Sequence, residues 1–295
     1  ERELSYGRSG FSLQFMLDTS LSDGDRYPLK LSDLIVMPLD NDKAPEKIIW
    51  GRNPQYEIKE LPNLGLAGDK YYGPSDTVGS YLDYTGSVMA VDPSGRGADE
   101  TAFAVVKMLS GQLFVTDAGG VKGGYSNEAL QALAVVARRN KVNEIIVESN
   151  FGDGMFTELF KPVLYKVHDV TIGEVRHSKQ KEHRIIDTLE PVMNQHRLIV
   201  DPKVIERDWQ SVQGYSQEKA PKYCLFHQMT RITNLRGALA HDDRLDALSM
   251  AVSYWTEQMA ASADKAMFDR KEELLMETLE QFSTGSLLKK QQAPE

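Results

Sequence analysis

Acidic residues stand at three points of the sequence that folding could bring together. Asp92 ends an apolar segment at 87–91, and Glu148 ends another at 144–148. A third group opens the last strongly amphipathic helix that the sequence predicts: Asp242, Asp243 and Asp246. Crowded carboxylates repel one another and raise one another's pKa values, and a divalent cation relieves that repulsion. Because these ligands are all oxygens, the cluster favours Mg²⁺ or Mn²⁺ over Zn²⁺.

Two such ions in one acidic cluster are typical of a nuclease. Held about 4 Å apart, they can bind the attacking water and the leaving oxygen of a phosphodiester. The acids also have ordinary structural explanations, since Asp92 can start a turn and Glu148 can end a strand. Asp242 and Asp243 can cap a helix, whose positive dipole end favours acidic residues. Asp246 extends the group beyond what capping needs, so the combination of three acidic positions favours a two-metal nuclease.

The segments between these acids predict an α/β fold. Strands are expected at 87–91, 102–109, 112–116, 144–148, 169–175 and 198–200, and helices at 126–140, 155–165, 178–196, 204–212 and 242–260. An antiparallel meander followed by βα units predicts a mixed β-sheet flanked by helices on both faces. A right-handed crossover would make the strands that end at Asp92 and Glu148 parallel and adjacent. Both carboxylates would then emerge at the sheet edge where α/β folds place their sites.

The chain divides into three parts by composition. Residues 1–80 contain prolines too frequently for long helices, so short strands and loops are expected there. Residues 81–260 carry the strands and helices described above. Residues 261–295 are charged and rich in glutamine, which is typical of a solvated helix with a frayed tail or of a partner-binding segment. A hairpin is expected within 214–235, and it is the element that we expect to touch DNA.

The overall composition limits the possible classes of protein. With 295 residues, 41% of them hydrophobic, the chain can build a packed core, but its formal net charge of −9 gives no general attraction to nucleic acid. The sequence contains no run of about 18 apolar residues, so it predicts no membrane span. The single cysteine, Cys224, suits a reducing cytosol. The first residues include neither a Met nor an apolar signal segment, so we expect a fragment of a longer, non-secreted protein.

A local basic region could still bind nucleic acid. Residues 170–240 contain 11 Lys or Arg against 8 Asp or Glu, although the whole chain is acidic. Basic side chains of this kind can follow a phosphate backbone, although an ordinary solvated surface explains each of them equally well. The candidates for DNA binding are Lys179, Lys181, Arg184, Lys222 and Arg231.

Three segments together resemble the RNase-H-like nucleases, and most closely the nuclease domain of a tailed-phage terminase large subunit of the short-tailed-phage type. The segments that match the three motifs of this family are 91–102, 145–150 and 241–248. Residues 11–17 look like the segment that ends the terminase ATPase domain. The resemblance covers residues 81–257 well and residues 1–80 loosely.

The resemblance implies roles for individual residues. The catalytic, metal-binding carboxylates would be Asp92, Glu148 and Asp243. Further ligands of the two Mg²⁺ or Mn²⁺ ions would be Asp242 and Asp246. These terminases have a helix with a basic start, and the corresponding residues here would be Lys179, Lys181 and Arg184. The domain would cut concatemeric double-stranded DNA by phosphodiester hydrolysis during packaging of a viral genome.

The resemblance also implies partners. They are double-stranded DNA, the small terminase subunit, the portal protein and the ATPase domain of the same full-length chain. Residues 261–295 are a candidate segment for binding the portal protein. No Gly-x-x-x-x-Gly-Lys-[Ser/Thr] loop occurs in the sequence, so we expect the ATPase domain to be absent. The protein would act in the host cytoplasm, transiently docked at the procapsid portal. Two rival functions stay open: a Holliday-junction resolvase or transposase of the same fold, and a non-catalytic DNA-packaging scaffold.

Overall fold

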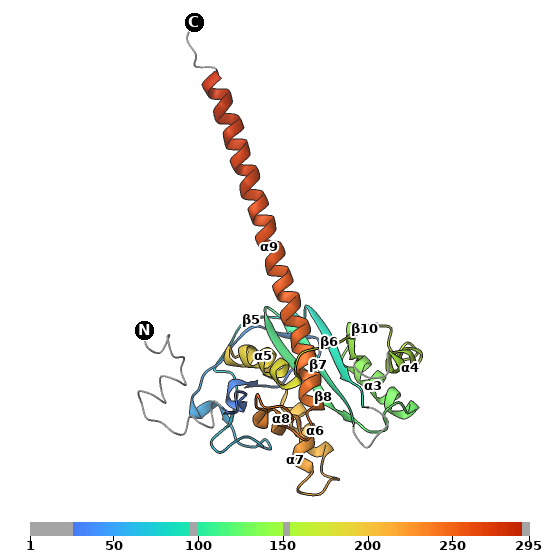
Figure 1. Cartoon of the computed structure of the whole chain (residues 1–295). Helices are drawn as coiled ribbons and strands as arrows, with labels where there is room; N and C mark the ends of the chain where they lie inside the picture. Colours follow the sequence, from blue (N-terminus) through green and yellow to red (C-terminus); the bar gives the residue numbers. More distant parts are fainter. Residues whose placement is uncertain (1–25, 95–99, 150–153, 291–295) are drawn as a thin grey trace. The chain divides into compact units, whose positions relative to one another are not determined.

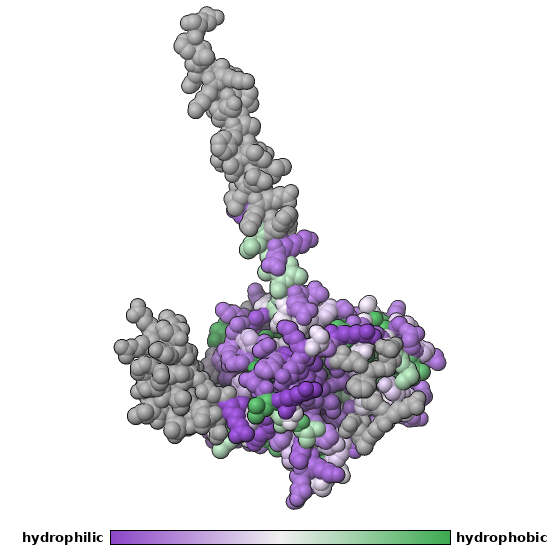
Figure 2. Space-filling view, in the orientation of Figure 1, coloured by the Kyte–Doolittle hydropathy of each residue, from purple (hydrophilic) through white to green (hydrophobic). Residues whose placement is uncertain are grey.

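The computed structural model describes residues 26–94, 100–149 and 154–290 (Figure 1). The segment 11–17, which resembles the end of an ATPase domain, lies outside these residues. The chain separates into two compact units, residues 1–253 and residues 254–295. Within the described residues, every helix is too short or too polar to cross a membrane. The face of the molecule in Figure 2 is mostly hydrophilic, with small apolar areas.

The main sheet is mixed, as the sequence predicts. Within the described residues it has seven strands, in the order β1-β11-β8-β7-β6-β9-β10. Their bounds are β1 (Ile35–Val36), β6 (Gly86–Asp92), β7 (Thr101–Leu109), β8 (Gln112–Val121), β9 (Glu144–Glu148), β10 (Thr171–Val175) and β11 (Leu198–Val200). Strands β6, β7 and β8 form the antiparallel meander, and Ser110 and Gly111 turn the chain between β7 and β8 with φ of 50° and 78°, as a tight hairpin requires.

Strands β6 and β9 are parallel neighbours, which confirms the predicted crossover. Val91 lies opposite Val147 in their register, so Asp92 and Glu148 follow side by side at the carboxyl ends. Val88, Met89, Ala90 and Val91 of β6 are completely buried. Full burial of consecutive residues means that both faces of the sheet are covered.

The helices are α3 (Asn127–Arg139), α4 (Met155–Leu164), α5 (Lys181–Asn194), α6 (Pro202–Ser211), α7 (Ala220–Tyr223), α8 (Leu225–Arg231) and α9 (Asp243–Lys290). Ser126 caps α3, since its hydroxyl accepts a hydrogen bond from the amide of Ala129 at 3.2 Å. Buried side chains of α3 and α4 share one core with Met89 and Val91 of β6. These two helices therefore cover one face of the sheet.

The two acidic strand ends point toward the opposite face. Side chains alternate along a strand, so Asp92 points away from Val91 and its partners on α3 and α4. Glu148 likewise points away from Val147, which belongs to the same core. Lys181 and Arg184 of α5 form ion pairs with these two carboxylates and also with Asp242 and Asp246 at the start of α9. Helices thus flank the sheet on both faces, as predicted.

The described part of 1–80 consists of short elements. They are the 3₁₀ turns η1 (Leu31–Asp33) and η2 (Pro54–Tyr56) and the strands β2 (Lys43–Ile49), β3 (Glu57–Ile58), β4 (Tyr71–Tyr72) and β5 (Asp76–Asp83). Strands β2 and β5 form an antiparallel pair. β1 joins the main sheet beside β11, and β5 runs across residue 80.

The expected hairpin within 214–235 is wrong, because helices α7 and α8 occupy half of this segment and none of it is strand. The buried residues Leu225, Phe226 and Met229 have helical rather than alternating spacing. The amide of Leu225 donates to Oδ1 of Asp208 at 3.0 Å, so a carboxylate from α6 caps α8.

Two helix boundaries also differ from expectation. Helix α5 begins at Lys181 after Gln180, whereas the sequence suggested a cap at Ser178. Helix α9 has the bounds Asp243–Lys290, so it ends well beyond the predicted boundary at residue 260.

Candidate metal centre

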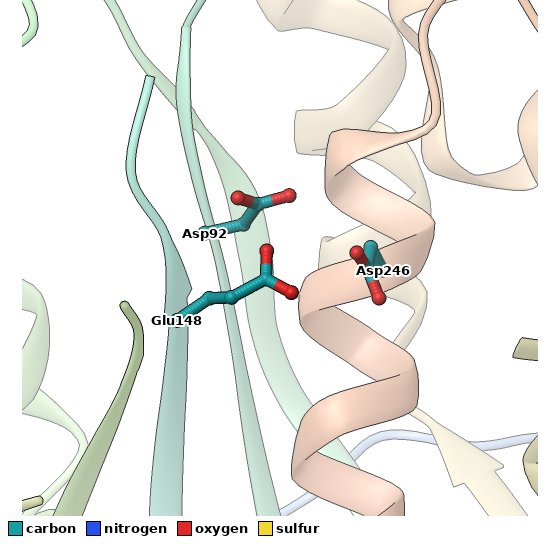
Figure 3. Close-up of side chains that lie close together, drawn as sticks. All are labelled: Asp92, Glu148 and Asp246. Atoms are coloured by element: carbon teal, nitrogen blue, oxygen red, sulfur yellow. The ribbon is translucent and has the colours of Figure 1, made fainter. Parts of the chain in front are cut away.

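Three carboxylates from three different elements converge at the carboxyl ends of the central strands. Asp92 of β6, Glu148 of β9 and Asp246 of α9 each offer an oxygen, and these oxygens all lie within 4.8 Å of one another (Figure 3). Asp92 is 8% exposed and Asp246 is fully buried, and the side chain of Glu148 is 10% exposed. Such a set of oxygen donors has the chemistry to bind a hard divalent cation.

The start of α9 determines which of its acids enters the cluster. The amide of Asp246 donates to the carbonyl of Asp242 at 2.8 Å in the first turn. The amide of Leu245 donates to Oε1 of Gln228 on α8 at 3.0 Å. With the turn held in this way, Asp246 faces the strands. Asp242 and Asp243 lie at a more open rim, where their side chains are 23% and 29% exposed.

The predicted third ligand, Asp243, is thus not in the group of three whose oxygens lie closest together. It remains near the cluster, because Nζ of Lys181 lies 3.8 Å from its Oδ1. Asp246, which we expected only to assist, is the one of the three acids at the start of α9 that is fully buried. The role of Asp243 in metal binding therefore stays a prediction.

Lys181 lies among the carboxylates rather than on an open surface. Its Nζ lies 2.8 Å from Oδ1 of Asp242 and 3.1 Å from Oδ2 of Asp246. It also lies 3.4 Å from Oδ2 of Asp92. An ammonium group from the first turn of α5 thus balances part of the negative charge of the cluster.

Arg184 supplies a second positive charge, one helical turn further along α5. Its Nη2 lies 2.8 Å from Oδ1 of Asp246 and 3.6 Å from Oε1 of Glu148. The Oδ1 atom of Asp246 nevertheless receives no well-directed hydrogen bond from the described residues. The guanidinium of Arg184 donates instead to Oδ2 of the same carboxylate at 2.9 Å, so Oδ1 keeps acceptor capacity for a cation.

Burial and mutual repulsion shift the protonation of the cluster. Burial raises the pKa of Asp92 well above its usual value, and the charges of Asp246 and Glu148 raise it further, while Lys181 opposes the shift. Burial and the charge of Asp246 also raise the pKa of Glu148. Burial disfavours the charged form of Lys181, but the surrounding carboxylates outweigh it and raise the pKa of this amine. Crowded, desolvated acids of this kind are common at functional sites.

The other basic candidates lie in different surroundings. Lys179 is exposed and lines a cavity of about 620 Å³ with Lys181, Arg236 and Asp242, next to the rim of the cluster. Lys222 is exposed on α7. Arg231 is half-buried, and its guanidinium donates to the hydroxyl of Thr230 at 3.2 Å.

Sequence reasoning missed a buried charged network beside the cluster. Arg244 lies between Asp243 and Asp246 in the sequence but is only 1% exposed, and it binds the carboxylates of Glu100 and Asp208. One available signal was its spacing, because Arg244 falls on the same helical stripe as the buried Leu248 and Ala251.

The fold and the acidic cluster define the class of protein. Residues 91–198 match the family model described as "Terminase Bacteriophage T7, Ribonuclease H-like domain". This stretch contains strands β7 to β10 of the mixed sheet and is a ribonuclease H-like domain of the terminase type. The chain is similar to the terminase large subunit of Enterobacteria phage T3, with 44% identity over 283 residues, which are 95% of this chain and 48% of that protein. It spans about half the length of this relative.

Solved structures of terminase nuclease domains also match. The large terminase nuclease of thermophilic phage G20c matches with a TM-score of 0.42 and 10% identity, over 77% of this chain and 98% of the other. The nuclease domain of the large terminase subunit of bacterial virus Sf6 gives a TM-score of 0.41 and 13% identity, over 57% of this chain and 88% of the other. The human cytomegalovirus terminase nuclease domain gives a TM-score of 0.41 and 14% identity, over 58% of this chain and 84% of the other.

Proposed function

We propose that this chain is the nuclease part of a terminase large subunit and that it cuts double-stranded DNA by metal-dependent phosphodiester hydrolysis. The observation that carries the proposal is the convergence of Asp92, Glu148 and Asp246, whose oxygens lie within 4.8 Å of one another in a largely buried cluster. We assign the innermost ligands to these three residues, with Asp242 and Asp243 at the rim. The expected ions are two Mg²⁺ or Mn²⁺.

The residues fit such a cation on three counts. All the donors are carboxylate oxygens, which are the ligands that Mg²⁺ and Mn²⁺ prefer. The Oδ1 atom of Asp246 is buried and lacks a directed hydrogen bond from the described residues. Desolvation disfavours the ionised forms of Asp92 and Glu148, and a bound cation would compensate for this. When bound, a divalent cation would supply Lewis-acid activation of the scissile phosphate and of the attacking water.

The protein's own side chains would orient the substrate around these ligands. The exposed rim at Asp242 and Asp243 is the side from which a duplex can reach the buried carboxylates. Lys179, exposed beside that rim, would bind a backbone phosphate. Lys181 and Arg184, which now contact the acids, would stabilise negative charge on the scissile phosphate. Lys222 and Arg231 remain candidates for more distant phosphate contacts.

We also propose a biological setting for this activity. A terminase large subunit of this kind would cut concatemeric DNA when a viral genome is packaged. Because the chain spans about half of the T3 protein, we propose that an ATPase domain belongs to the same full-length chain. The small terminase subunit and the portal protein would be its partners, and the reaction would take place in the host cytoplasm.

Plasmid digestion tests the proposal. Wild-type protein is incubated with supercoiled plasmid in Mn²⁺, in Mg²⁺ and in EDTA, beside Asp92→Asn. The expected result is nicking and linearisation only with a divalent ion, and loss of cutting in the variant. Asp117→Asn is a matched control, because Asp117 is also buried but pairs with Arg139 and Arg207 away from the cluster. Cutting in EDTA, or undiminished cutting by Asp92→Asn, would overturn the proposal. A four-way junction in the same assay tests the resolvase alternative.

A further inference from the structure

Arg244 forms a buried network that joins three elements. Its Nε donates to Oε1 of Glu100 at 2.5 Å and its Nη2 donates to Oε2 of Glu100 at 2.8 Å, which makes the pairing bidentate. Its Nη1 donates to Oδ1 of Asp208 at 2.7 Å and to the hydroxyl of Ser211 at 2.9 Å. Arg244 is 1% exposed, Glu100 3% and Asp208 2%. Paired donors of this geometry fix direction as well as distance.

Glu100 connects this network to the strand that carries Asp92. It directly precedes β7, whose residue Ala102 lies opposite Asp92 in the antiparallel register. The next residue, Thr101, accepts a hydrogen bond from the amide of Ser94 at 3.2 Å. The chain that follows Asp92 is therefore tied to the residue next to Glu100.

The other end of the network connects to Asp246. Arg244 precedes Asp246 by two residues in the first turn of α9. The second carboxylate, Asp208, also caps α8 through the amide of Leu225. Helix α8 in turn supplies Gln228, which accepts from the amide of Leu245. The first turn of α9 is thus held on both sides of Arg244.

Gly120 gives independent evidence that the position of Glu100 is closely fitted. Gly120 lies opposite Ala102 on β8, and a Cβ atom there would be 2.0 Å from Cδ of Glu100. Any other residue at this position would push the carboxylate away from Arg244. Gly120 thus makes room for the ion pair between Glu100 and Arg244.

Stability alone is a weak explanation for these buried charges. The network contains one cation and two carboxylates, so it carries a formal excess of negative charge beside an acidic cluster. Replacing buried ion pairs with apolar residues is often neutral or stabilising, because desolvation offsets the attraction. What a rigid ion pair does provide is a fixed geometry between the elements that it joins.

We infer that Arg244 and Glu100 are positioning residues that set the separation between Asp246 on α9 and Asp92 on β6, so that the metal centre is formed before the cation arrives. The inference rests on the proposed function, since it concerns the same carboxylates. Residues that orient metal ligands affect metal affinity even though they do not touch the metal.

Mn²⁺ titration followed by electron paramagnetic resonance tests this inference. Glu100→Gln keeps the shape of the side chain but loses one hydrogen-bond acceptor. Arg244→Lys keeps the positive charge but loses the bidentate pairing with Glu100. Gly120→Ala leaves all three charges in place and displaces Glu100. For each variant that keeps the wild-type circular dichroism spectrum, we expect the Mn²⁺ dissociation constant to rise about tenfold or more and the spectrum of the bound ion to change. Part of the cutting rate should return at saturating Mn²⁺.

Asp117→Asn separates positioning from simple loss of stability. It breaks the pairing of the buried Asp117 carboxylate with the half-exposed Arg139 outside the network, so it should lower the melting temperature without changing the Mn²⁺ affinity. Wild-type Mn²⁺ affinity in folded Glu100→Gln and Gly120→Ala would overturn the inference, as would an equal loss of affinity in Asp117→Asn. If Asp92→Asn also binds Mn²⁺ like wild type, the proposed function itself fails. If only Asp92→Asn loses affinity, the proposed function stands and the positioning role does not.

Discussion

Nζ of Lys181 lies 3.1 Å from Oδ2 of Asp246, so an ammonium group from α5 reaches the most deeply buried acid of the cluster. The same amine also contacts Asp92 and Asp242. Lysine and a divalent cation would therefore compensate the same negative charge. The charge balance of the site depends on which of them is close to the carboxylates.

Replacing Lys181 with Met should separate these two contributions. In EDTA, Lys181→Met should lower the melting temperature by about 2 to 4 °C, because the carboxylates lose a counter-charge. Mn²⁺ should then raise the melting temperature of the variant by more than that of the wild type. Differential scanning fluorimetry with and without Mn²⁺ measures both effects. An equal Mn²⁺-induced rise in the two proteins would contradict the competition, and Lys179→Met serves as a control at an exposed lysine nearby.

Substitution at the start of α9 distinguishes the buried acid from the rim acids. Asp246→Asn should reduce metal-dependent cutting by about a hundredfold or more, whereas Asp243→Asn should reduce it by about tenfold. The reason is that the Asp246 carboxylate lies with Asp92 and Glu148, while Asp243 is 29% exposed at the rim. Initial rates of plasmid cleavage across a Mn²⁺ series measure the difference. The reverse order of severity would show that Asp243 is the third ligand.

The raised pKa of Asp92 predicts a pH-dependent effect on stability. A carboxyl group whose pKa is higher in the folded chain than the usual 3.8 keeps its proton where the unfolded chain has lost it. It therefore stabilises the fold at low pH, and that contribution is lost as the pH rises through the raised value. Asn cannot ionise, so without metal the melting temperature of Asp92→Asn should exceed that of the wild type at neutral pH, by a margin that shrinks as the pH falls toward the usual pKa of 3.8. Melting curves in EDTA across this range provide the measurement, and a margin that widens on acidification would refute the assignment.

Lys179 should affect DNA binding rather than the metal. Lys179→Ala should weaken duplex binding and reduce the slope of log K against log salt concentration by about one, because one phosphate contact is lost. Its Mn²⁺ affinity should stay at the wild-type value, since its amine is not among the ion pairs that join Lys181 to the acids. Fluorescence anisotropy with a short duplex at several salt concentrations measures the slope. An unchanged slope would remove Lys179 from the DNA-binding surface.

The central sheet could be predicted because its signals are local. The apolar segments at 87–91 and 144–148 each end in an acid, and right-handed crossover geometry then makes their strands parallel neighbours. This was sufficient to place Asp92 beside Glu148. No long-range contact had to be known in advance.

The third carboxylate could not be chosen from the sequence. Asp242, Asp243 and Asp246 share the first turns of one helix, so the choice depends on the rotation of that helix about its own axis. Contacts with Glu100, Asp208 and Gln228 hold that rotation, and all of these residues are distant in sequence. The same limitation explains the incorrect hairpin, because the cap of α8 comes from Asp208, 17 residues before Leu225.

The position of β6 has a consequence for partial unfolding. It pairs with β7 on one side and β9 on the other, whereas β1 and β10 form the margins of the sheet. Amide protons of β6 should therefore exchange with deuterated solvent among the slowest in the domain, and opening of a marginal strand should leave Asp92 and Glu148 together. The two strand acids would thus remain in place in states that have already lost the edges of the sheet.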